Sequence, residues 1–240
     1  MKTLFYKHLE WDSKQLDLQC GLIGFRDISP DINQYELADN LIQIIGENQD
    51  ADFITIKMPG DLPIALNCLL KNSARLIDTE LIYKFDHTSD VNKEHDVNFF
   101  DSFDSELFIP LADEMVFSRF YMDDNIPRDK ARKLWSESIR NHCMGRADRL
   151  AIVYVQGQPV GMATLNFGDN KNINLHIVGV LKSFQGHGIG SSLMSRITKE
   201  YGGKHEIFVE AQSLNKGAQR FYKRAGFFLD SMRYILHVWA

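Results

Sequence analysis

Of all features in the sequence, a glycine-rich turn between a predicted strand and a predicted helix most limits the folds that this chain can adopt. Residues 178–190 read Val-Gly-Val-Leu-Lys-Ser-Phe-Gln-Gly-His-Gly-Ile-Gly, so that Gly186, Gly188 and Gly190 alternate with larger residues. Glycine lets backbone N–H groups approach a ligand without a Cβ in the way. The first N–H groups of the following helix have no intrahelical acceptor and lie at the positive end of the helix dipole. The segment therefore predicts a site for an anion such as a pyrophosphate.

Two other phosphate-binding motifs do not fit this turn. Dinucleotide-binding turns have the spacing GxGxxG, whereas Gly186, Gly188 and Gly190 are spaced GxGxG. A Walker loop ends in Gly-Lys-Ser or Gly-Lys-Thr, and no such run follows here. A glycine-rich turn that binds nothing is the simpler alternative, which the turn alone leaves open.

The residues around the turn resemble the GNAT N-acyltransferase superfamily. Gln185-x-x-Gly188-x-Gly190 is similar to its coenzyme A signature, (Gln/Arg)-x-x-Gly-x-(Gly/Ala). About 30 residues downstream, residues 215–227 contain the superfamily's pattern Asn-x-x-Ala-x-x-x-Tyr-x-x-x-Gly-Phe. Lys182 stands where the superfamily often has proline, a difference expected to alter only the turn. The resemblance covers residues 98–240.

This resemblance implies that acetyl-CoA is the acyl donor and that the turn holds its pyrophosphate. The strand before the turn would pair its backbone with the pantetheine arm, and an amide there could polarise the thioester carbonyl. As alternatives to these cofactor contacts, Val178 and Val180 could be ordinary buried strand residues, and Asn215 could be the N-cap of a helix. The implied cofactor-binding residues are Val178, Gly179, Val180, Gln185, Gly186, His187, Gly188, Ile189, Gly190, Ser191 and Asn215.

Tyr222 and His176 are the candidate catalytic residues. The resemblance implies that Tyr222 is the general acid for the leaving thiolate, while its place on an apolar helical stripe favours core packing instead. His176 precedes the turn on the side of the strand predicted to carry Val178 and Val180, and its imidazole could take the proton of an amine. Glu210 and water are alternative bases. No cysteine lies in the signature segments, which favours direct transfer without an acyl-enzyme, and no metal site is predicted.

A weaker resemblance to the bacterial TDP-fucosamine acetyltransferases extends over the whole chain. It rests on short stretches, namely Leu9–Ser13, Phe117–Phe120, Pro127 and Trp135–Glu137. It implies that the acceptor is the 4-amino group of a nucleotide-linked amino sugar. Arginines that could bind the diphosphate, or simply be solvated, are Arg119, Arg128, Arg132 and Arg140. Another small amine, a protein amine and a non-catalytic acyl-CoA-binding module are the alternatives.

The hydrophobic pattern predicts an α/β chain with a boundary in the polar stretch 87–96. A small N-terminal α/β domain, 1–95, would precede a GNAT domain, 96–240, with a mixed, mainly antiparallel sheet. Strands are predicted over 21–25, 53–56, 81–85, 150–155, 160–166, 172–180, 206–211 and 227–239. Helices are predicted over 31–46, 61–70 with Asp61 as its N-cap, 105–117, 127–143, 189–201 and 215–225.

Composition and charge limit the classes of ligand that the protein could bind and indicate the cellular compartment in which it is expected. The 240 residues are 44% hydrophobic and 25% charged, which is typical of a packed core, and the net charge of −5 disfavours nucleic-acid binding. Residues 101–240 carry a net charge of +3 against −8 for residues 1–100, which favours an anionic ligand in the second part unless it reflects chance. Three widely spaced cysteines indicate reduced thiols in a cytoplasmic protein. No apolar run is long enough to span a membrane, and the N-terminus turns polar too early for a signal peptide. The sequence leaves open whether the protein forms a homodimer.

Overall fold

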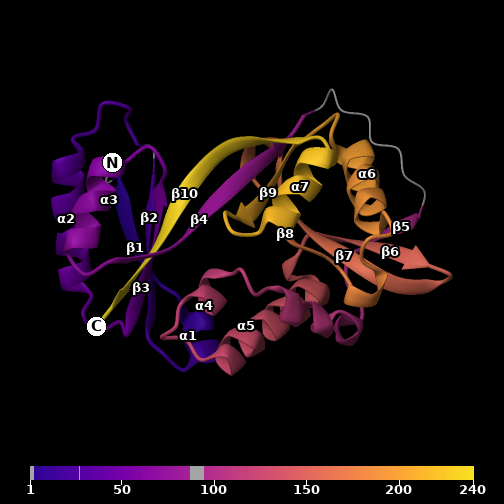
Figure 1. The fold of residues 1–240 in the computed structure, drawn as a ribbon, viewed down its shortest axis with the longest axis horizontal. Helices are drawn as coiled ribbons and strands as arrows, with labels where there is room; N and C mark the ends of the chain where they lie inside the picture. Colours follow the sequence, from indigo (N-terminus) through magenta and orange to yellow (C-terminus); the bar gives the residue numbers. More distant parts are fainter. Residues whose placement is uncertain (1–2, 27, 87–94) are drawn as a thin grey trace. The chain divides into compact units, whose positions relative to one another are not determined.

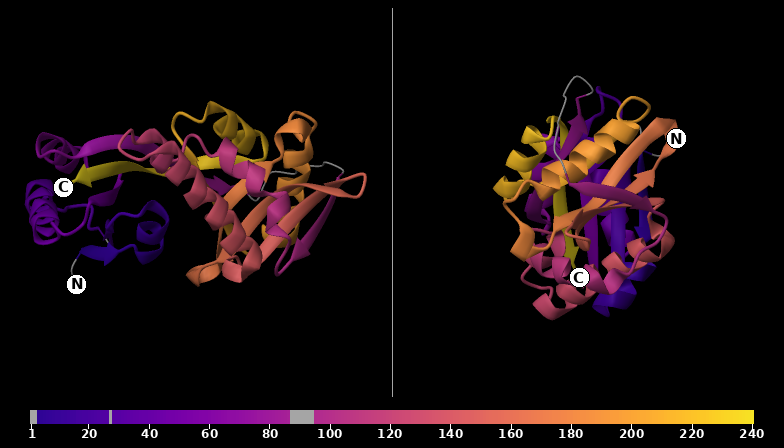
Figure 2. Two further views of the ribbon diagram at one scale, coloured as in Figure 1. Left: turned by 90° about the horizontal axis from the view of Figure 1, so that it is seen from below. Right: turned by 90° about the vertical axis from the view of Figure 1, so that its right-hand side faces the viewer.

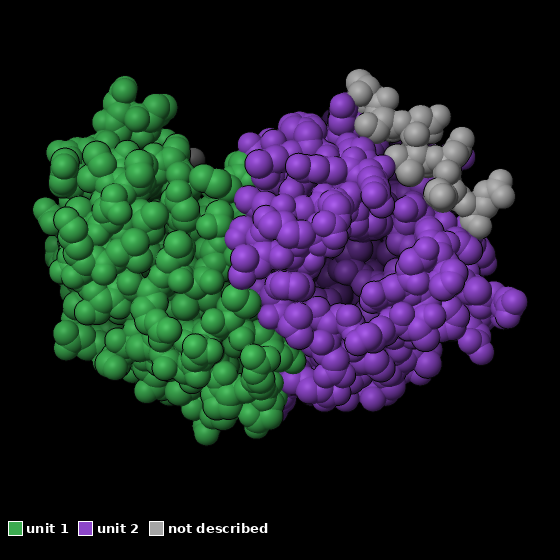
Figure 3. Space-filling model, in the orientation of Figure 1, with its two compact units in different colours: residues 1–80, 118–131, 231–240 green, residues 81–117, 132–230 purple. Residues whose placement is uncertain are grey.

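The computed structural model describes residues 3–26, 28–86 and 95–240 (Figure 1). It divides into two compact units, coloured separately in Figure 3. The first unit comprises residues 1–80, 118–131 and 231–240, and the second comprises residues 81–117 and 132–230. This division differs from the predicted one between residues 95 and 96, because two later segments join the first unit. The predicted boundary, 87–96, lies mostly outside the described residues.

The sheet of the first unit has the strand order β1-β2-β3-β10-β4. Its strands are β1 (Leu4–His8), β2 (Cys20–Phe25), β3 (Phe53–Pro59), the end of β10 (Phe227–Trp239) and the start of β4 (Arg75–Phe85). Its helices are α1 (Glu10–Leu16), α2 (Gln34–Glu47), α3 (Pro63–Lys71), α4 (Arg119–Met122) and the first turn of α5 (Arg128–Asn141). Leu41 of α2, Leu69 of α3 and Ile56 of β3 are fully buried in one apolar cluster. The strands predicted over 21–25 and 53–56 and the helices predicted over 31–46 and 61–70 are confirmed, whereas β1, α1, α4 and the start of β4 were not predicted.

The start of α3 corrects one prediction. Its N-cap residue is Leu62, which makes no side-chain capping bond, and not Asp61. The side chain of Gln34, on α2, takes over this role, because its Oε1 accepts from the N–H of Ile64 at 2.9 Å. A residue distant in sequence thus satisfies a helix end that local pattern assigned to Asp61.

The second unit carries the strand order β10-β4-β9-β8-β7-β6-β5. Its further strands are β5 (Asp96–Phe100), β6 (Arg149–Val155), β7 (Gln158–Phe167), β8 (Asn172–Val180) and β9 (Glu206–Gln212). Strands β5 to β8 are antiparallel neighbours, whereas β8 and β9 are parallel. The predicted mixed, mainly antiparallel sheet is confirmed. Gln156 and Gly157, both at positive φ, form the tight β6–β7 turn.

Helices cover both faces of this sheet. Helices α6 (Ile189–Tyr201) and α7 (Lys216–Arg224) pack on one face, where Leu193 and Tyr222 join the largest apolar cluster. The last three turns of α5 cover the other face, where Ile139 contacts a separate cluster with Met162 and Ile177. Figures 1 and 2 show α6 and α7 on one side of the strands and α5 on the other.

The predicted helix over 105–117 is wrong. Two short 3₁₀ segments, Ser105–Leu107 and Ile109–Glu114, occupy this stretch. Pro110 supplies the reason, since it has no N–H for a helical bond and disfavours the α conformation of the residue before it. The remaining short elements are a π-helical turn at His142–Arg146 and 3₁₀ turns at Asp169–Lys171 and Lys182–Phe184.

Candidate functional site

The glycine turn leads into α6 as predicted. Gly186 and Gly188 adopt φ values of 85° and 79°, in the left-handed region that favours glycine, and α6 begins at Ile189 directly after them. Gly188 is the N-cap and makes no side-chain capping bond, so the first-turn N–H groups stay available to a ligand. His187 lies between the two left-handed glycines and Ser191 lies in the first turn of α6. The local geometry is that of an anion site.

Two residues of this segment have structural roles of their own. The Nε2 of Gln185 donates to the carbonyl oxygen of Val180 at 2.9 Å, which ties the turn back to β8. A Cβ on Gly190 would lie 3.1 Å from the ring of Phe221 on α7. A larger residue at 190 would therefore need the Phe221 ring to shift by a few tenths of an ångström.

Strands β8 and β9 part beside this turn. Their parallel register runs from Asn172 opposite Glu206 to Leu175 opposite Val209 and ends there, within the residues that the structure describes. Beyond this point, which we call the strand fork, β8 continues to Val180 paired with β7 alone. The half-buried residues 178–180 thus have one strand edge without a β9 partner. The space-filling view shows the second unit hollowed near its middle (Figure 3).

A β-bulge in β8 lies at the strand fork. Ala163 pairs with Val178 and Leu165 pairs with Leu175, so two residues, His176 and Ile177, oppose the single residue Thr164. The hydroxyl of Thr164 accepts from the N–H of Ile177 at 3.0 Å.

The bulge corrects the predicted side of His176. Val178 and Val180 pack against the α6 and α7 side, whereas the His176 ring lies 5.9 Å from that of His142, at the end of α5. His176 is exposed and directly follows the last pair of the β8–β9 register, as does Glu210 on β9. The two candidate bases therefore occupy matching positions at the strand fork, although His176 does not share a face with the two valines.

Tyr222 is buried on α7, with 6% of its surface exposed. The rings of Tyr83, Phe221 and Phe227 surround it at centroid distances of 6.0, 5.2 and 6.0 Å. Burial raises the pKa of its phenol, which makes it a weaker acid than an exposed tyrosine. The position suits both core packing and a proton donor.

Asn215 is the N-cap of α7. Its Oδ1 accepts from the N–H of Ala218 at 3.0 Å. The capping role considered from sequence is thus observed, and a cofactor contact would have to use the remaining side-chain N–H₂ group.

Three of the four candidate arginines are paired with carboxylates. Arg132 holds Asp113 in a fork with distances of 2.5 and 3.1 Å, and its hydrogen bonds lower the pKa of that carboxyl. Arg140 contacts Glu106 and Glu137. In the first unit, Arg119 contacts Asp12 at 3.1 Å, while Arg128 is exposed on α5. This pairing reduces the positive charge available to a nucleotide.

Sequence reasoning missed His142 and Thr164. The Thr164 hydroxyl bonds to the bulge and the His142 ring lies near that of His176, but neither residue stands in a recognisable motif. The strongest local signal is the isolated polar residue at position 164 in the apolar run Val160–Leu165.

The mixed sheet, with β8 and β9 parting beside the glycine turn, is a fold shared with GNAT acetyltransferases of known structure. Residues 113–227, slightly less than half of the chain, match the model of the acetyltransferase (GNAT) family. The described residues include no helix long and apolar enough to cross a lipid bilayer.

Relatives and solved structures agree with this fold. The spore coat polysaccharide biosynthesis protein SpsD of Bacillus subtilis is 29% identical over 139 residues, which are 57% of this chain and 48% of that protein. The chain thus spans about half the length of this relative. A GCN5-related N-acetyltransferase from Sphaerobacter thermophilus superposes with a TM-score of 0.64 at 15% identity, over 98% of this chain and 76% of its own. A conserved protein of unknown function from Staphylococcus epidermidis gives 0.62 at 17% identity, over 95% and 88%.

Proposed function

We propose that this protein transfers the acetyl group of acetyl-CoA to a primary amine of a sugar. The leading acceptor is the 4-amino group of a TDP-linked amino sugar. The observation that carries the transfer reaction is the strand fork, because it leaves the edge of β8 at residues 178–180 without a β9 partner and next to an uncapped helix start. A location in the cytoplasm, expected from the cysteine pattern, belongs to the same proposal.

Two features of the second unit suit the binding of coenzyme A. The free edge of β8 offers backbone groups to the amides of a pantetheine arm, and the uncapped first turn of α6 offers N–H groups to a pyrophosphate. Gly186 has open space where a Cβ would point, so a ligand can approach the backbone there. Acetyl-CoA is thus treated as a substrate that supplies the acetyl group.

The proposed reaction is a direct transfer. The amine nitrogen attacks the thioester carbonyl carbon, a C–N bond forms, and the C–S bond breaks. The departing sulfur takes the phenolic proton of Tyr222. The nitrogen loses a proton to His176, to Glu210 or to water, and solvent returns a proton to the Tyr222 oxygen.

The sugar acceptor rests on the comparison with SpsD, whose name places it in polysaccharide biosynthesis. A nucleotide on that sugar is supported by the net charge of +3 over residues 101–240. The pairing of Arg132 and Arg140 with carboxylates weakens that support, so a nucleotide would have to displace Asp113 or Glu106 from its arginine.

Release of free coenzyme A tests the proposal with a set of amines. The set holds a TDP-linked 4-amino sugar, the same amino sugar without nucleotide, a simple alkylamine and a lysine peptide. Fast release with the first two supports a sugar acceptor, and equal kcat/KM for these two would mean that the nucleotide is not recognised. Release of coenzyme A with the lysine peptide alone would mean that the acceptor is a protein amine and not a sugar. Binding of acetyl-CoA without release for any amine would contradict the catalytic role.

A further inference from the structure

We propose that His142 is a positioning residue for His176, because its neutral ring packs beside His176 and accepts a hydrogen bond from it when His176 takes up the amine's proton. This inference rests on the proposed function, since it assigns the base of the same site. It makes His176, and not Glu210 or water alone, the group that receives the proton.

The first step of the argument is placement. His142 directly follows α5, at the start of the turn His142–Arg146, in which Gly145 adopts a left-handed φ of 104°. Its ring is 6% exposed and lies 5.9 Å from the ring of His176, with 45° between the ring planes. The bulge opposite Thr164 is what directs His176 towards this turn.

The second step is the tautomer of His142. Its Nδ1 lies 2.8 Å from the carbonyl oxygen of Ser138, one turn earlier on α5. A carbonyl oxygen only accepts, so Nδ1 must carry the hydrogen. In the neutral ring the lone pair then belongs to Nε2. The Ser138 contact therefore makes Nε2 of His142 an acceptor and fixes the ring in one orientation.

The third step is charge. Burial, helped by the charges of Arg146 and His176 and opposed by the bond to Ser138, lowers the pKa of His142 to about 4. His142 thus remains neutral throughout the range near pH 6.5 in which an ordinary histidine titrates. A neutral acceptor stabilises a protonated neighbour, whereas a second cation would oppose it. Among charged groups, Arg146 lies on the same turn, and Glu210 occupies the matching position on β9.

The test is an NMR pH titration of the His176 ring in the full chain without substrate. The variant His142→Phe keeps a ring but removes the acceptor, and the pKa of His176 should fall by about one unit, as expected for loss of one hydrogen bond to a charged group. His142→Gln returns an acceptor oxygen near the Nε2 position and should restore most of the shift. His205→Phe is the matched control, because His205 is a ring-packed histidine of the same unit, against Phe167 and Tyr201.

An unchanged His176 pKa in a folded His142→Phe protein would overturn the proposal. If that variant fails to fold, the ¹⁵N shifts of His142 in the unmodified protein decide, since a hydrogen on Nε2 or a charged ring at pH 6 would contradict the assignment. These readouts need no turnover, so failure of the acetyl-transfer proposal would be recognised separately as an inactive parent enzyme. In an active enzyme, the acidic limb of kcat/KM should move to lower pH by the same shift while KM for acetyl-CoA stays unchanged.

Discussion

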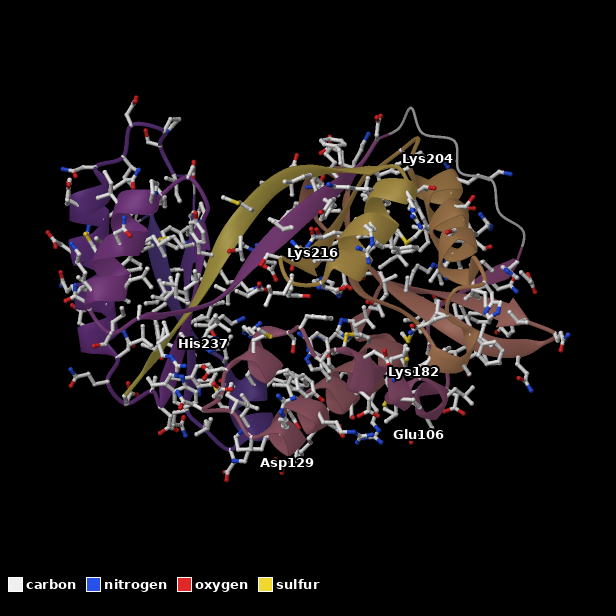
Figure 4. All side chains as sticks on the ribbon, viewed as in Figure 1. Glu106, Asp129, Lys182, Lys204, Lys216 and His237 are labelled. Carbon is white, nitrogen blue, oxygen red and sulfur yellow. The ribbon has the colours of Figure 1, made fainter. Side chains whose placement is uncertain are left out.

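Nδ1 of His237 lies 2.6 Å from Oδ2 of Asp123, and neither side chain is exposed to solvent. His237 lies on β10 (Figure 4), while Asp123 follows α4. The Nε1 of Trp239 donates to the same carboxylate oxygen at 2.9 Å, and the N–H of Asn125 donates to the other at 3.0 Å. These bonds join residues 118–131 to the end of β10, which in turn pairs with β3 of the first unit.

This buried pair predicts loss of stability in acid. Burial alone would raise the pKa of Asp123, but the bonds from His237, Asn125 and Trp239 outweigh it and hold that pKa at about 2. A depressed carboxyl pKa stabilises the fold above the unfolded value near 4, by about 2 kcal/mol, and this contribution is lost as the pH falls towards 2. Burial also lowers the pKa of His237, so a further loss begins below about pH 6.5.

Unfolding midpoints measured between pH 7 and pH 2.5 test this with Asp123→Asn. The variant should be less stable at pH 7 and should depend less on pH below 4. Asp124→Asn is the control, since its carboxyl is the exposed neighbour, and it should follow the unmodified protein. Parallel curves for Asp123→Asn and the unmodified protein would mean that Asp123 does not link pH to stability.

Gly188→Val should weaken acetyl-CoA binding tenfold or more, which is about 1.4 kcal/mol. A β-branched side chain would stand at the N-cap of α6, where the pyrophosphate must approach, and it would strain a residue at φ 79°. Calorimetry on folded protein measures the affinity. Gly203→Ala is the control, because it is exposed and a Cβ there would meet nothing within 4 Å. Unchanged affinity in folded Gly188→Val would remove the pyrophosphate from this turn.

Tyr222→Phe should lower turnover by about 10² to 10⁴ while acetyl-CoA affinity and folding stay nearly unchanged. The ring and its packing remain, and only the proton donor is lost. Tyr83→Phe removes a phenol oxygen from the same cluster, 6.0 Å away between ring centroids, and should leave turnover unaffected. Measurements must be made where chemistry limits the rate. Near-normal turnover of Tyr222→Phe would leave the residue as core and another group as the acid.

Local sequence was sufficient to predict the structure wherever the conformation of a segment depends on its own residues. The alternating glycines define the turn before α6, and Asn215 caps α7 through Ala218, three residues on. Prediction from sequence failed where the local conformation depends on a residue that is distant in the chain. Gln34 caps α3 in place of Asp61, and the bulge at His176 lies opposite Thr164 of β7, whose hydroxyl bonds to it. Period-2 alternation cannot register an inserted residue, so His176 was assigned to the wrong face.

Thr164→Val should disturb the strand fork, since its hydroxyl is the acceptor for the bulged N–H of Ile177. Thr164 is fully buried, so valine keeps the shape but leaves that N–H without its partner, at a cost of about 1–3 kcal/mol of stability. Because the same bulge directs His176, kcat should fall as well, whereas Thr164→Ser should retain both properties. Thr198→Val is the matched control, as it removes a helical bond to Ser195 on α6 and should lower stability only slightly. Denaturant unfolding and kcat are measured on all three. Full stability and full turnover of Thr164→Val would show that the bulge needs no side-chain acceptor and that His176 owes its placement to the strand register alone.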